Sequence, residues 1–143
     1  MTPYSKVYDA FLARILEDEW GNWSLEEAER DWKHCLDAAK IWFKFPRVDL
    51  DGDENGFFGD LGNEEIQILA NYMKCEWLNR SIMTWENIKP LYAEKDFSQA
   101  NLLDKLKAML EREEAKAAKA ESNYYRAIKG KPFNYRMLSE NAN

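Results

Sequence analysis

The stretch NEEIQILANYMKCEWLNRSIMTW, residues 63–85, decides the fold. Its apolar side chains recur at steps of three and four residues, which predicts one broad apolar stripe on an α-helix. We expect Asn63 to be the N-cap, with Glu64 and Glu65 in the first turn, where the helix dipole favours negative charge. This content of Trp, Met and Leu over roughly six turns predicts the central helix of the core. The predicted stripe consists of Ile66, Leu69, Ala70, Met73, Trp77, Leu78 and Ile82.

The composition indicates a single helical domain. The chain has 143 residues, with 45% apolar, 14% aromatic and 32% charged side chains, which favours a packed core with solvated outer faces. The net charge of −6 argues against a protein that grips phosphates, because such proteins usually have a basic surface. An acidic surface can still line a passage for DNA without holding it.

The two cysteines, Cys35 and Cys75, each fall on an apolar helical stripe. This favours small buried side chains over a disulfide. The sequence has no run of 18 apolar residues and no signal-peptide pattern at its start, so we expect no membrane span and a cytosolic site of synthesis.

Four further helical patterns are read in chain order, which predicts an all-α fold of four or five helices. The first is 4–20. The second starts at Ser24 with a capping box and ends before Pro46, with Trp32 and Trp42 directed inward. A short piece, 85–92, is expected to bend or end at Pro90. A long C-terminal helix is expected from 99 to 129.

Residues 47–62, RVDLDGDENGFFGDLG, form the one long irregular insertion. The turn residues between 52 and 56 predict a short β-hairpin, with an ordered projecting loop as the alternative. Asp51, Asp53 and Asn55 also match the first ligand positions of an EF-hand loop. The twelfth position, where a bidentate Glu is required, is Gly62. We therefore prefer an acidic turn to a calcium site and expect no metal.

The end of the chain shows no pattern that would pack it against the core of a single molecule. The second half of the last helix, EREEAKAAKAES, should project from the globule or pack by alanine against a neighbour. Gly130 is expected to cap this helix. We expect one helical domain, 1–129, followed by an extended docking arm, 130–143.

The sequence contains no arrangement of residues that predicts catalysis. His34 is the only histidine, and no phosphate loop or Cys-x-x-Cys pair is present. Tryptophans at helical spacing favour a core role over stacking on bases or sugars. We therefore expect no enzyme activity and no cofactor.

The pattern F..DL...EIQILA.YM...WL is followed by KDFSQAN.L..L and then by a charged helix that ends in YYR...GKPF. This succession resembles the head–tail connector proteins of tailed bacteriophages, also called adaptor or head-completion proteins. The resemblance covers about residues 4–133. The residues that carry it are Phe58, Leu61, 65–70, Met73, Trp77, Leu78, 95–101 and 124–126.

The resemblance implies a virion protein of the phage neck, assembled in the host cytoplasm. Such proteins form a ring, usually of twelve copies, between the portal protein and the stopper or tail-completion protein, and DNA passes through the ring. The residues implied to face the portal or a neighbouring subunit are Tyr124, Tyr125, Arg126, Phe133, Tyr135, Arg136, Met137 and Leu138. The residues implied to face the channel or the next ring are Asp51, Asp53, Glu54, Asn55 and Phe57. The alternatives are a calcium-dependent binding module and a small helical regulatory protein.

Overall fold

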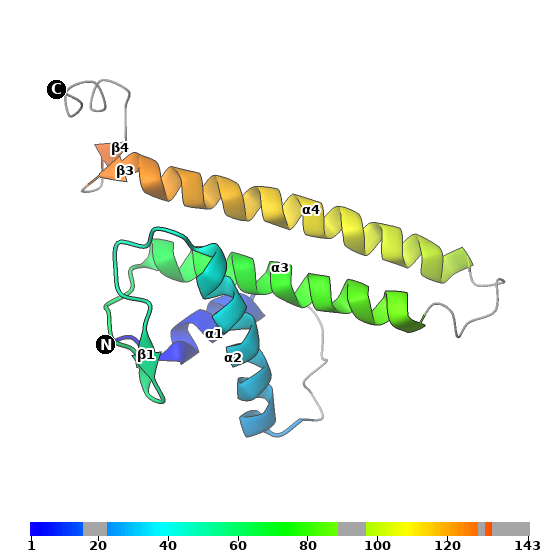
Figure 1. Ribbon diagram of the computed structural model, residues 1–143, viewed down its shortest axis with the longest axis horizontal. Coiled ribbons are helices and arrows are strands. Elements are labelled where there is room, and N and C mark those ends of the chain that lie inside the picture. Colours follow the sequence, from blue (N-terminus) through cyan, green and yellow to red (C-terminus); the bar gives the residue numbers. More distant parts are fainter. Residues whose placement is uncertain (16–22, 89–96, 129–130, 133–143) are drawn as a thin grey trace.

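The computed structural model describes residues 1–15, 23–88, 97–128 and 131–132, and this part of the chain is mainly helical (Figure 1). The predicted all-α fold with a long C-terminal helix is confirmed. The helices are α1 (Tyr4–Leu12), α2 (Leu25–Trp42), α3 (Asn63–Ile88) and α4 (Phe97–Arg126). Two short hairpins join β1 (Gly52–Asp53) to β2 (Gly56–Phe57) and β3 (Ala127–Ile128) to β4 (Lys131–Pro132). None of the described helices is both long enough and apolar enough to cross a membrane.

Helix α3 is the centre of the fold, as predicted. It contacts α1, α2 and α4, and Figure 1 shows α4 running antiparallel along it. The prediction of a single apolar stripe is wrong, because each neighbouring helix covers a different side of α3. Its buried residues therefore lie all around the helix axis. They are Glu65, Ile68, Leu69, Ala70, Tyr72, Met73, Cys75, Trp77, Leu78 and Ile82.

The helix ends differ in part from the predictions. Ser24 caps α2 as expected, because its side chain accepts a hydrogen bond from the Glu27 N–H at 3.2 Å. Helix α2 ends at Trp42, three residues before Phe45. Asn63 is not the N-cap of α3. The Ile66 N–H donates to the carbonyl of residue 62 at 3.1 Å, so the helix is capped one residue before Asn63.

The other boundaries also shift. Helix α1 ends at Leu12, and residues 13–15 form a turn, so the predicted helix 4–20 is too long over its described part. Helix α3 continues past Trp85 to Ile88, so no new helix begins at residue 85. The predicted bend at Pro90 lies outside the described residues.

Polar side chains hold α3 to each neighbouring helix. Arg80 makes two hydrogen bonds to the Asp31 carboxylate of α2, at 2.8 and 3.0 Å. Lys74 pairs with Glu113 of α4 at 3.0 Å, and both side chains are largely buried. On the α1 side, Arg14 donates to Asn71 at 2.8 Å. Because these pairs are partly shielded from water, removing one partner would leave the other poorly solvated.

The predicted β-hairpin in the insertion is confirmed. Strands β1 and β2 pair antiparallel around a tip at residues 54–55, and Thr2 adds a bridge to Phe57 on the other edge. The Thr2 N–H donates to the Phe57 carbonyl at 3.0 Å, and the Phe57 N–H donates back at 2.8 Å. Gly56 has φ +150°, and a Cβ there would lie 2.4 Å from the Thr2 carbonyl oxygen. This position therefore requires glycine.

The second half of α4 packs against the rest of the molecule and does not project from it. Ala117 and Tyr124 are buried, so the alternative of packing by alanine is confirmed. The helix ends at Arg126, before the predicted end at 129, and the predicted cap, Gly130, lies outside the described residues. Residues 131–132 turn back to pair with 127–128, whereas the extended arm was expected to leave the helix directly. Residues 133–143 of that arm lie outside the described residues.

Candidate partner interface

Three exposed aromatic side chains gather where the C-terminal ends of α2 and α4 meet. We call Trp42, Phe45 and Tyr125 the aromatic ledge. Their exposed fractions are 59%, 71% and 36%. Ile41, in the same last turn of α2, is 80% exposed. Exposed apolar side chains that cluster in this way mark surfaces that bind another molecule.

Ring contacts hold the ledge in place. The ring of Trp42 stacks on that of Tyr72 of α3, with centroids 6.4 Å apart and an interplanar angle of 19°. The ring of Phe45 meets that of Tyr125 edge to face at 5.8 Å, and Tyr125 meets Tyr124 in the same way at 5.7 Å. Aromatic pairs in these geometries add stability beyond the area they bury. The ledge is thus pre-organised for binding.

A hollow of about 420 Å³ lies beside Trp42, between α3 and α4. Its lining mixes apolar and acidic side chains: Trp42, Tyr72, Cys75, Glu76, Asn79, Glu114 and Ala118. Burial, and then the nearby carboxylates of Glu114 and Glu113, raise the pKa of the Cys75 thiol to about 12. The thiol is therefore a neutral, unreactive part of the wall at physiological pH. The hollow suits an apolar side chain with a cation close to it.

A buried carboxylate fixes the ledge from below. Glu121 of α4 accepts hydrogen bonds from the hydroxyls of Tyr72 and Tyr125. The Tyr125 hydroxyl in turn accepts the Phe45 N–H at 3.1 Å. Burial and the bond to Glu121 raise the pKa of Tyr125 to about 12, and the pKa of Tyr72 also rises for these reasons. Both phenols stay protonated at neutral pH, so both remain donors to Glu121.

Tyr124, the residue before Tyr125, is 3% exposed. Its hydroxyl accepts the Arg47 N–H at 2.7 Å and donates to the Glu65 carboxylate at 3.3 Å. The Arg47 guanidinium lies 3.9 Å from the centre of the Tyr124 ring, and the ring of Phe43 packs on it at 5.3 Å. Tyr124 thus locks the end of α4 to the start of the insertion. Its assignment to the partner surface is wrong, because the folded chain already buries it.

The other residues assigned to this interface fall into two groups. Tyr125 and Arg126 are exposed at the end of α4. The remaining five lie outside the described residues: Phe133, Tyr135, Arg136, Met137 and Leu138.

Sequence reasoning missed the α2 part of the ledge. Trp42 was expected in the core, but it lies at the edge of the face that buries Cys35, Ala39 and Phe43. Two signals were available. Ile41 falls on the opposite side of α2 from those buried residues, and Phe45 directly precedes the proline that prevents further helix.

The hairpin places four of its five assigned residues on the surface. Asp51, Asp53, Glu54 and Asn55 are exposed around the tip, whereas Phe57 is fully buried and cannot face a channel. The Asp53 carboxylate accepts the Asn55 N–H at 2.8 Å, and its carbonyl accepts the Tyr4 hydroxyl at 2.7 Å. Within the described residues, no three acidic, His or Cys side chains form a group suited to a metal ion. No family model, curated protein or solved structure matches this chain.

Proposed function

We propose that this chain is a structural subunit of the neck of a tailed bacteriophage. In this proposal, copies of the chain form an adaptor ring between the portal protein and the stopper or tail-completion protein, and DNA passes through the ring. The observation that carries the proposal is the aromatic ledge beside its hollow, at the end of the molecule where the C-terminal segment begins. The sequence resemblance supplies the identity of the partner, and the ledge supplies a surface for it.

The ledge has the properties of an interface that forms only in an assembly. Trp42 and Phe45 are large and mostly exposed, yet ring contacts and the Glu121 network hold them in place. Rigid aromatic anchors of this kind contribute most of the binding energy of many interfaces. Little conformational entropy is lost when such side chains are already ordered. The ledge therefore suits a stable structural contact.

The acidic charge of the chain suits a passage for DNA. The net charge of each copy is −6, so a ring of copies is strongly acidic. Like charges repel phosphates, so a wall of this sign lets DNA slide without being held.

Two experiments test the proposal: one locates the chain in the particle, and the other asks whether assembly requires the aromatic ledge. A cryo-EM reconstruction of the phage neck should contain a ring of density between portal and tail into which α3 and α4 fit as an antiparallel pair. Density for this chain at any other place would refute the proposal. A purified chain that binds neither portal nor particle would point to the helical regulatory protein.

Variants connect the ledge to assembly. We expect Trp42→Ala with Phe45→Ala to fold normally but to lose binding to the portal protein. Leu25→Ala is the matched control, because Leu25 is 68% exposed at the other end of α2. Truncation after Lys129 tests the arm separately, and we expect a folded chain that no longer enters particles. Normal assembly of the truncated chain would restrict the interface to the ledge.

A further inference from the structure

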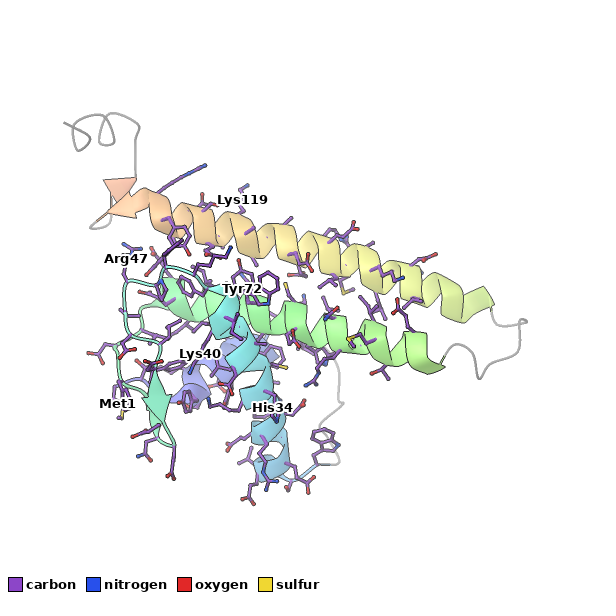
Figure 2. The ribbon with its side chains drawn as sticks, viewed as in Figure 1. Met1, His34, Lys40, Arg47, Tyr72 and Lys119 are labelled. Atoms are coloured by element: carbon purple, nitrogen blue, oxygen red, sulfur yellow. The ribbon has the colours of Figure 1, made fainter. Side chains whose placement is uncertain are left out.

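The exposed face of α4 carries a stripe of positive charge on an acidic protein. The five stripe residues are separated by seven, four, three and seven positions, which places them on one side of a helix. All are exposed, and Figure 2 shows Lys119 on the side of α4 that faces away from α3. We call Lys105, Arg112, Lys116, Lys119 and Arg126 the basic stripe.

The stripe is not the mixed charge pattern of an ordinary solvated helix. Arg112 has Ala, Met, Ala and Lys at the positions three and four residues away, and Lys119 has Ala, Lys, Ser and Asn. Lys116 has like charges at Arg112 and Lys119, and the one carboxylate three or four residues away from it, Glu113, is paired with Lys74 of α3. In the described residues, the ion pairs of α4 involve Glu113 and Lys107 and leave the stripe unpaired. A helix face whose cations have no ion pair is suited to a negatively charged partner.

The surface beside the stripe is hollowed. Its lining consists of Met109, Ala115, three stripe cations and the Lys74–Glu113 ion pair; the three cations are Arg112, Lys116 and Lys119. Because Glu113 is already paired with Lys74, the lining keeps an excess of positive charge that suits an element carrying carboxylates.

A protruding element of that kind exists on the same chain. The β1–β2 hairpin and the three residues before it expose Asp49, Asp51, Asp53 and Glu54. The Thr2 bridge and the Tyr4 hydroxyl bond hold the hairpin in one shape. Lys40 is the nearby cation, and it is partly buried, with its amine 5.4 Å from the centre of the Phe57 ring. The hairpin therefore remains a rigid acidic knob.

The two charged surfaces cannot meet within one molecule. Figure 1 shows the hairpin and α4 on opposite sides of α3. We propose that the basic stripe of one copy binds the acidic hairpin of the next copy, head to tail. A contact between two different surfaces of the same chain continues from copy to copy and closes into a ring when the rotation permits. This inference deepens the proposed adaptor ring, and its ring closure rests on that proposal.

A second copy is the partner that the charges favour. The net charge of −6 includes the five stripe cations, so the rest of the chain carries −6 − 5, or −11. Every copy thus brings the acidic surface that the stripe needs, whereas the same −11 repels duplex DNA. DNA binding by the stripe is the competing outcome of the test.

The experiment reverses each surface separately and then both together. The stripe variant is Lys116→Glu with Lys119→Glu. The hairpin variant is Asp51→Lys with Glu54→Lys, which spares the Asp53 carboxylate that caps the turn. The swapped variant carries all four changes and keeps the net charge of −6, since one pair lowers it by four and the other raises it by four.

Sedimentation velocity is run on each chain between about 0.01 and about 1 M salt, where the Debye length falls from about 30 Å to about 3 Å. We expect the natural chain to self-associate at low salt and to dissociate at high salt. The stripe and hairpin variants should associate about tenfold more weakly or worse, and the swapped variant should recover. The control is Lys6→Glu with Arg30→Glu, two exposed cations on α1 and α2, which lowers the net charge by the same four units and should leave association like that of the natural chain.

Four results would overturn the stripe–hairpin contact. The first is a natural chain that stays monomeric at low salt and high concentration. The second is a swapped variant that does not recover. The third is stripe-dependent binding of fluorescent duplex DNA by a chain that does not self-associate. Rings whose formation ignores all four changes would refute this contact but leave the adaptor ring standing, because the neck reconstruction tests that ring independently.

Discussion

Replacing Tyr124 by phenylalanine tests how the end of α4 is joined to the globule. The change removes one hydroxyl and keeps the ring, with its contacts to Phe43 at 5.3 Å and to the Arg47 guanidinium at 3.9 Å. The hydroxyl has two partners, the Arg47 N–H at 2.7 Å and the Glu65 carboxylate at 3.3 Å. Both partners are left behind when it goes.

The expected loss of stability is about 2 kcal/mol. Leaving the partly buried Arg47 N–H without an acceptor costs about 1–2 kcal/mol, and the longer bond to Glu65 adds about 0.5 kcal/mol. Glu65 is only 8% exposed, so water replaces the lost donor poorly. For a chain of this size, 2 kcal/mol lowers Tm by about 8 °C. Tyr124→Ala should cost about 3 kcal/mol more, because it also removes the buried ring.

The assay is urea unfolding followed by tryptophan fluorescence and by far-UV circular dichroism. Coincident transitions would support a two-state analysis, and an unchanged m value would show that stability alone changed. The matched control is Tyr125→Phe. Tyr125 is 36% exposed, so water can take over its hydrogen bonds, and we expect a loss below about 1 kcal/mol. The error of such measurements is about 0.5 kcal/mol. If the free energy of unfolding of Tyr124→Phe differs from that of the natural chain by less than this, the hydroxyl of Tyr124 does not stabilise the fold.

Three further outcomes are expected. Met73→Asp should abolish cooperative melting, because Met73 is fully buried and an unpaired carboxylate cannot be accommodated there. Met83→Asp, at a 54% exposed site, should melt normally. Equal melting of both variants would show that the core face is wrong. Asp51→Ala with Asp53→Ala should lower Tm by the same amount in calcium and in chelator, and a calcium-induced rise in Tm confined to the natural chain would favour the calcium module. Because folding raises the pKa of Tyr125 to about 12 from its ordinary value of about 10, its contribution is complete below about pH 10 and is lost as the pH rises through about 12. Melting temperatures should therefore fall over this range, and less in Tyr125→Phe; identical pH profiles would contradict the assignment.

The elements set by local chemistry could be predicted from the sequence. The Ser24 cap and the hairpin depend on short-range turn and capping rules, and the structure has both. The central position of α3 also followed, because a long apolar pattern must be covered. The apolar spacing within residues 63–85 does not reveal how many helices cover α3. The prediction therefore missed that side chains on all sides of α3 are buried.

The candidate interface depends on long-range packing, which the sequence does not display. Ala117 gives no apolar signal, yet it is fully buried where α4 lies against α3. Tyr124 and Tyr125 are neighbours with the same side chain, and only the position of Arg47 and Glu121 decides which is internal. Trp42 looks like a core residue on any helical wheel, but its contact with Tyr72 of α3 leaves it 59% exposed.

The order of the helices along the chain affects how the protein folds as it is synthesised. The central helix α3 is complete before α4, which supplies the cover for one of its sides. Until α4 emerges, the apolar side chains that it will cover stay in water, and nascent chains in this condition are prone to aggregation. The covering helix has eleven charged side chains among its 30 residues, and its second half has little apolar surface to start collapse. A ribosome that pauses between the two helices would therefore hold the chain at its most vulnerable point.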